Sequence, residues 1–176
     1  MSRNGHPGGG VVERAIPDWP KLPRPLLVRA ESLPAGSLAR AHAHPWVQLS
    51  WARSGVLQVA TATARYLAPP QRAIWIPAGV GHEVRTSGRA EMRSLYLASK
   101  LLSRGERCQV LTISPLVREL IVAAGGFAAD YDEAGPEGRL VAVLLDALAA
   151  APEVAFDLPL PRDRRAGPGR PDGRAD

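Results

Sequence analysis

Apolar and polar positions alternate over short stretches through the first two thirds of the chain. The stretches are bounded by Gly, Pro and other turn-forming residues, a pattern typical of β-strands. The alternation predicts eight strands: Leu26–Ala30, Trp46–Ala52, Val56–Thr61, Arg65–Leu67, Ala73–Ile76, His82–Thr86, Met92–Leu97 and Gln109–Ile113. Short strands at spacings of about ten residues predict an all-β sandwich or barrel.

The apolar spacing changes to a helical one after Ser114. Ser114 is suited to be an N-cap, Pro115 to be the first helical residue, and Gly125 to end the helix. A second helix is predicted in "PEGRLVAVLLDALAAAP", where Pro152 stops it. Both helices carry an apolar stripe, which either packs on the barrel wall or pairs with a second copy of the chain. The stripe alone does not distinguish these alternatives.

Both ends of the chain differ from this middle part in composition. Residues 1–22 are rich in Gly and Pro and are expected to form a flexible arm. Residues 153–176 are expected to form a disordered tail, because "PRDRRAGPGRPDGRAD" contains no apolar residue larger than Ala. The predicted organisation is therefore a barrel over residues 23–113 and a helical segment over residues 114–152.

Composition and charge narrow the function classes. The single cysteine, Cys108, excludes an internal disulfide and favours a reducing compartment. No secretory signal and no membrane-spanning apolar run is visible, so we expect a cytoplasmic protein with no membrane partner. The net charge of +5 points toward nucleic acid. However, most arginines stand singly between apolar positions, as expected for solvent-facing strand positions.

Three of the 4 histidines lie in two short segments. If residues 42–48 are extended, His42, His44, Trp46 and Gln48 all point to one face of a strand. His82 follows the tight turn "PAGVGH" and reaches the same interior if the strands close into a barrel. Three imidazoles, with Gln48 as a fourth ligand, predict a site for a divalent transition metal (Zn, Fe, Mn or Ni).

The spacing of these residues resembles the two motifs of the cupin superfamily, whose fold is a double-stranded β-helix, or jelly-roll, barrel. Gly36-x5-His42-x-His44-x3-Gln48-x6-Gly55 is similar to the first motif, with Gln48 where a Glu is usual. Pro77-x-Gly79-x2-His82 is similar to the core of the second motif. The second motif departs from the pattern in having Gln71 for its preceding Gly and Thr86 for its trailing Asn. The resemblance predicts a cupin barrel followed by two C-terminal α-helices.

A narrower resemblance covers residues 26 to 160. Four segments together resemble the N-terminal sensing and dimerisation domain of AraC-type transcription regulators: "HPWVQLSWARSGVLQVAT", "PPQRAIWIPAGVGHEV", "MRSLYL" and "VLTISPLVRELI". The resemblance implies a small-molecule effector in the barrel, with Trp46, Trp75 and Tyr96 as candidate pocket walls. It also implies a homodimer formed through the helical segment, with candidate contacts at Leu116, Leu120, Leu140, Leu144 and Leu148.

Regulators of this kind continue into a helix-turn-helix domain, whereas this sequence turns into "RAGPGRPDGRAD". We therefore expect a regulator truncated before its DNA-binding domain, and not an enzyme. We expect that this chain does not bind DNA by itself. The three imidazoles leave two alternatives open. One is a pocket that binds an effector without metal, and the other is a stand-alone metal-dependent cupin enzyme, such as a dioxygenase or isomerase.

Overall fold

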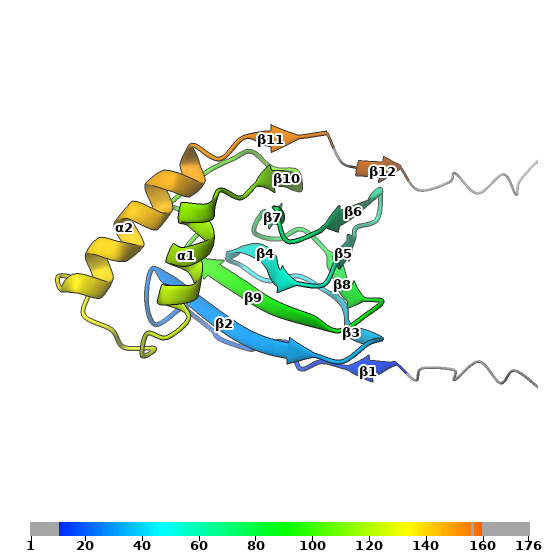
Figure 1. The fold of residues 1–176 in the computed structure, drawn as a ribbon, viewed down its shortest axis with the longest axis horizontal. Helices are drawn as coiled ribbons and strands as arrows, with labels where there is room; N and C mark the ends of the chain where they lie inside the picture. The colour runs from blue at the N-terminus through cyan, green and yellow to red at the C-terminus, as the bar shows by residue number, and fades with distance from the viewer. Residues whose placement is uncertain (1–10, 156, 160–176) are drawn as a thin grey trace, which may run out of the picture.

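The computed structural model describes residues 11–155 and 157–159, and two six-stranded β-sheets with two helices make up its fold (Figure 1). Sheet A has the strand order β1-β3-β8-β5-β6-β12 and sheet B the order β11-β10-β7-β4-β9-β2. The strands of sheet A are β1 (Val12–Glu13), β3 (Ser37–His42), β5 (Leu57–Ala60), β6 (Ala64–Ala68), β8 (His82–Thr86) and β12 (Asp157–Pro159). Those of sheet B are β2 (Leu26–Leu33), β4 (Val47–Ser54), β7 (Arg72–Ile76), β9 (Ala90–Leu97), β10 (Gln109–Thr112) and β11 (Glu153–Val154).

Four antiparallel pairs are nested inside one another along the chain. The innermost is β5 with β6, followed outward by β4 with β7, β3 with β8 and β2 with β9. Successive pairs belong to alternate sheets, so the folded-over ribbon winds into two facing sheets. This topology confirms the predicted double-stranded β-helix. The two sheets face each other without hydrogen-bonding into a fully closed barrel.

Tight turns make the winding possible. Gly55, between β4 and β5, has φ of 83°, a conformation that other residues seldom adopt. A Cβ at Gly55 would also lie 2.3 Å from the carbonyl oxygen of Arg89. The first-motif glycine is therefore required by both its backbone conformation and the close approach of the β8–β9 connection.

Both predicted helices are present. Helix α1 (Pro115–Ala124) begins where the hydroxyl of Ser114 accepts a hydrogen bond from the backbone N–H of Val117, at 3.2 Å. Helix α2 (Pro136–Ala149) also begins with a proline. The two helices lie side by side against the outer face of sheet B (Figure 1). None of the helices in the described residues is long and apolar enough to cross a membrane.

The protein has two cores, which lie on opposite faces of sheet B. The helix-side core contains large apolar side chains of sheet B and the helices, among them Trp51, Trp75 and Leu144. The inter-sheet core contains smaller apolar side chains such as Val59 and Ile74. Because both faces of sheet B are covered, its inner strands β4, β7 and β9 are buried along most of their length.

The structure extends the predicted element list. All eight predicted strands are present within two or three residues of their predicted bounds, and β1, β3, β11 and β12 are additional. Strand β1 pairs with β3, so residues 12–13 of the predicted flexible arm are docked on sheet A. Likewise β11 and β12 add strands from the part predicted to be a disordered tail. Of the predicted arm and tail, residues 1–10, 156 and 160–176 lie outside the described residues.

Candidate metal and ligand site

Three histidines converge at one end of the space between the sheets. His42 is the last residue of β3 and His82 the first of β8, and the two are direct partners in the strand register. Their ring centroids are 4.3 Å apart, and the His44 centroid lies 5.1 Å from that of His82. One ligating nitrogen from each ring lies within 4.8 Å of the other two. The predicted convergence of the three imidazoles is therefore present.

The backbone brings the three histidines together in a different way from the one that we expected. We expected residues 42–48 to form one extended strand whose even-numbered side chains share a face. Instead His42 ends a strand of sheet A, Gln48 lies in a strand of sheet B, and His44 lies on the connection between them. The side chains meet because this connection crosses the end of the space between the sheets.

Hydrogen bonds to the backbone orient all three rings. The Nδ1 atoms of His42, His44 and His82 lie 2.6, 2.8 and 2.9 Å from the carbonyl oxygens of Arg40, Trp46 and Val80, respectively. Because a carbonyl only accepts, each Nδ1 carries the proton, and in the neutral ring the lone pair is on Nε2. Metal-binding histidines are oriented in this way by their second nitrogen.

Burial keeps His82 neutral. Its side chain is 1% exposed, and burial lowers its pKa to about 4. Burial also lowers the pKa of His42. The Nε2 atom of His82 is buried without a hydrogen-bond partner. A buried lone pair of this kind is costly unless it binds a cation or a donor, so the donor set fits a divalent transition metal.

Gln48 lies beside His44 and is hydrogen-bonded on the inner side of sheet B. Its Oε1 lies 2.9 Å from Nε2 of His44, and its Nε2 donates to the hydroxyl of Ser50 at 2.9 Å. When His44 is neutral and donates from Nδ1, its Nε2 lone pair faces the lone pairs of the Gln48 oxygen. Either a cation bound by both atoms or the reverse amide orientation, in which the Gln48 amide N–H donates to Nε2 of His44, removes this conflict.

The second histidine-containing segment also fixes the first. Gly79, in the turn before His82, has φ of 78°, and its backbone N–H donates to the carbonyl oxygen of His44 at 2.9 Å. The turn "PAGVGH" therefore holds the backbone of His44 and also positions His82. The positive φ of Gly79 gives a structural reason for the glycine in the second motif.

Two of the three candidate pocket aromatics lie beside the histidines. The Trp46 ring stacks on His44 with centroids 5.0 Å apart and an interplanar angle of 8°, and Tyr96 meets His44 edge-on at 6.4 Å. Trp19, which the sequence did not single out, contacts both Trp46 and Tyr96. Trp75 belongs to the helix-side core, across sheet B from the imidazoles.

The candidate dimerisation residues fall into two groups. Leu144 and Leu148 are fully buried in the helix-side core of the same chain. Leu120 and Leu140 are partly buried against that core, and Leu116 is 60% exposed. The exposed large apolar side chains of the two helices are therefore Leu116 and Val143, the latter 49% exposed.

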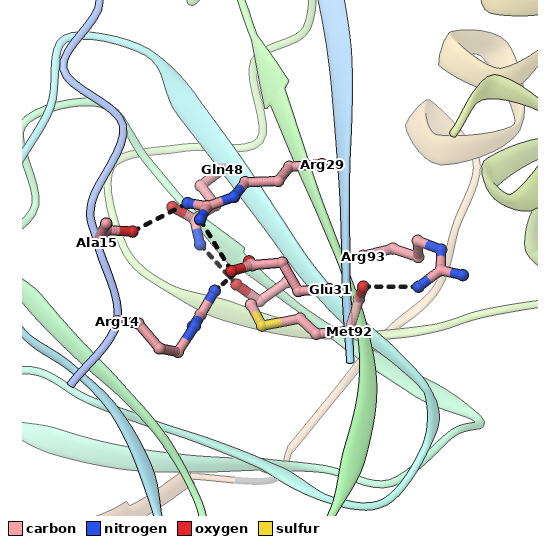
Figure 2. Close-up of polar contacts among 8 residues, drawn as sticks. Arg14, Ala15, Arg29, Glu31, Gln48, Met92 and Arg93 are labelled. Atoms are coloured by element: carbon pink, nitrogen blue, oxygen red, sulfur yellow. Dashed lines mark hydrogen bonds and ion pairs between the residues drawn. The ribbon is translucent and has the colours of Figure 1, made fainter. Parts of the chain in front are cut away.

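Sequence reasoning missed a charged group on the inner wall. Arg29 and Glu31 in β2 share the face of Leu33, which lies in the inter-sheet core, and Arg14 follows β1. Both arginines form ion pairs with Glu31 (Figure 2). The signal was two charged residues at alternate positions of a strand whose other face is apolar. It was overlooked because the predicted strand ended at Ala30.

A family model described as "AraC-like ligand binding domain" matches residues 26–149. A curated relative, the HTH-type transcriptional regulator NimR of Escherichia coli (strain K12), is 33% identical over 119 residues. The match covers 68% of this chain and 44% of NimR, so the chain spans less than half the length of that relative.

Solved structures of ToxT from Vibrio cholerae have a similar fold. The apo K231A protein from strain SCE256 has a TM-score of 0.55 at 8% identity and matches 71% of this chain and 54% of its own. The P21 crystal form of ToxT has a TM-score of 0.53 at 5% identity, over 71% of this chain and 55% of its own. At these identities the likeness shows the fold alone.

Proposed function

Since the chain belongs to the family of AraC-like ligand-binding domains, we propose that it is the effector-sensing and dimerising domain of a transcription regulator. In this proposal a small molecule binds between the sheets at the histidine end and shifts the domain between two states. The observation that carries the proposal is the group of buried polar side chains, His44, Gln48 and His82, inside an otherwise apolar fold.

We propose further that a divalent transition metal forms the floor of this site. His42, His44 and His82 would hold it through their Nε2 atoms, with Gln48 as the fourth protein ligand. All three rings are already oriented by backbone carbonyls, so little ordering is needed on binding. Such an ion supplies a Lewis-acidic contact for an oxygen or nitrogen atom of the effector.

Metal content tests this site directly. The purified chain is dialysed against Zn²⁺, Ni²⁺, Mn²⁺ or Fe²⁺, and bound metal is measured by elemental analysis. We expect about one ion per chain, and a loss of affinity of at least about 100-fold in His82→Ala, because even outer-shell partners contribute 10- to 100-fold. Val84→Ala, on the same strand and in the inter-sheet core, is the matched control and should retain metal. Equal metal content in all three proteins would contradict the proposed ion.

The dimer is proposed to form through the exposed apolar surface at Leu116 and Val143. Sedimentation velocity of the purified chain should show a dimer, and Leu116→Glu should shift it to monomer. Val56→Glu is the control, because Val56 is an apolar residue of the barrel that is 40% exposed. A wild-type monomer at all concentrations, or a dimer unaffected by Leu116→Glu, would contradict this interface.

The same imidazole set favours one second candidate function, a metal-dependent cupin enzyme. Three histidines around an ion with an open coordination position also suit catalysis. The two functions differ in turnover. A metal-loaded chain that converts a small organic acid or diketone, with activity lost in His82→Ala, would establish the enzyme. Saturable binding without chemical change supports the sensing domain.

A further inference from the structure

The inner wall of sheet B carries more polar side chains than a structural core needs. Strand register places Ser50 opposite Ser94, and Ser94 opposite Arg29 on the next strand. The adjacent row places Gln48 opposite Tyr96. Ser50 and Ser94 are fully buried, and Gln48 and Tyr96 are 4% and 3% exposed. Burying polar groups is unfavourable unless each of them is hydrogen-bonded.

Buried polar atoms from both sheets lack a hydrogen-bond partner. Within the described residues, the buried side-chain atoms without a hydrogen bond include Arg14 Nε, Ser94 Oγ and His82 Nε2. Arg14 is the most informative of them, because its side chain is only 9% exposed and yet retains a free N–H donor. A buried guanidinium with a free donor is suited to binding an anion.

The charges on this wall do not balance. Arg14 and Arg29 converge on the single carboxylate of Glu31 (Figure 2). Arg29 pairs with Glu31 at 3.0 Å and also donates to the carbonyl oxygen of Ala15 at 2.9 Å. Two cations against one anion leave one positive charge in excess, and the side chain of Glu31 is only 14% exposed. Partial burial strengthens the attraction of this excess charge for an anion.

This cluster and the histidine end share one cavity. Its lining includes Arg14, Arg29, His42, Gln48 and Tyr96. The remaining free space is about 10 Å³, room for no more than about one water molecule. Residues 14–17 form one side of the cavity and Glu31 holds the two guanidinium groups. A ligand therefore enters by displacing groups that belong to the chain itself.

We propose that the effector is a small organic carboxylate, and that its carboxylate group replaces Glu31 as the partner of Arg14 and Arg29. Glu31 is then an internal competitor that occupies the anion position when no ligand is present. A guanidinium fork binds a carboxylate in bidentate fashion, which sets the orientation of the ligand. The remainder of the ligand extends toward Tyr96 and the imidazoles. This inference rests on the proposed sensing function, because it names the chemical class of the effector.

Calorimetric titration at constant ionic strength tests this proposed carboxylate site. Benzoate is the probe, and benzamide is its neutral counterpart. Glu31→Gln keeps the shape of the side chain and removes the competing charge, so we expect benzoate to bind roughly tenfold more tightly than to the wild type. Arg29→Gln should weaken binding by about tenfold or more. Benzamide should bind no protein of the series appreciably.

Arg93→Gln is the matched control. Arg93 lies on β9, the strand paired with β2, but on the opposite side of the sheet from Glu31, and it donates to the carbonyl oxygen of Met92 (Figure 2). Its substitution removes the same charge and should leave benzoate affinity unchanged. Where Glu31→Gln fails to fold, Glu31→Asp withdraws the carboxylate by one methylene and should give an intermediate gain.

Three results would overturn the inference. One is equal binding of benzoate and benzamide, another is equal loss of benzoate affinity in Arg29→Gln and Arg93→Gln, and the third is no benzoate binding by any variant. Each of these leaves the metal titration and the dimer measurement unaffected, so failure here is distinguishable from failure of the proposed function.

Discussion

The two cores on either face of sheet B differ in what they contain. The helix-side core holds the largest apolar side chains, and its buried tryptophan Trp51 has a partner for its indole N–H in the carbonyl oxygen of Pro70. The histidine end of the inter-sheet space instead holds buried polar groups, of which His82 and Ser94 have atoms without a partner. The first arrangement favours stability, and the second retains unmet hydrogen-bonding capacity, as binding sites do.

Substitution of Trp75 should have the largest effect on stability and should distinguish the two cores most clearly. Trp75→Ala should lower the free energy of unfolding by about 3–5 kcal/mol, because it leaves a cavity under the helices. Metal content should be unchanged, since Trp75 lies across the sheet from the imidazoles. Urea denaturation and elemental analysis measure the two quantities. A loss of metal with little loss of stability would assign Trp75 to the ligand pocket instead.

Acid pH should destabilise the folded protein through His82, which is buried between the two sheets. A histidine in the unfolded chain titrates near 6.5, whereas burial lowers the pKa of His82 to about 4 in the folded protein. Between these values the unfolded state binds a proton that the native state does not. The stability is therefore complete above pH 6.5 and declines as pH falls to about 4, by roughly 3 kcal/mol.

Urea denaturation of metal-free protein at several pH values checks this dependence, and His82→Asn provides the comparison. Other groups contribute to the acid limb in both proteins, so the difference between their slopes isolates His82. Parallel slopes for the two proteins would show that the imidazole is not desolvated as the structure describes.

Substitution of Gly79 should lower stability by a smaller amount and should also weaken metal binding. Gly79→Ala forces a side chain into a left-handed conformation, with an expected loss of about 1–2 kcal/mol. The contact of its N–H with His44 should shift as well and weaken metal binding. Gly81→Ala is the control, because a Cβ there meets nothing within 4 Å. Its stability should change by no more than about 0.5 kcal/mol.

Substitution of Ser94 should have the smallest effect on stability. Its hydroxyl is buried without a partner, so Ser94→Ala should leave stability unchanged or raise it by up to about 1 kcal/mol. The next residue, Leu95, faces the helix-side core, and Leu95→Ala should lose about 2–5 kcal/mol. Thermal unfolding of both variants measures the contrast. Similar losses at the two positions would contradict the division of sheet B into a structural and a binding face.

Local signals account for what the sequence predicted well. Ser114 and Pro115 fix the start of α1 through contacts within one turn, and β8 was predicted with its observed bounds. Strand β3, "SLARAH", was missed because it has no β-branched or aromatic residue, and it depends on pairing with β8 and β1. The docking of residues 12–13 on β3 was missed because the partner strand is distant in sequence.

Within the described residues, the sequence by itself predicted eight of the twelve strands, both helices and the presence of three imidazoles in motifs typical of a metal site. It did not determine which side of a strand faces which core, because alternation defines two faces without saying what covers each. Only the tertiary structure decided that Trp75 packs under the helices. It also decided that Arg14 and Arg29 share Glu31, since that meeting depends on segments brought together by sheet pairing and not by spacing along the chain.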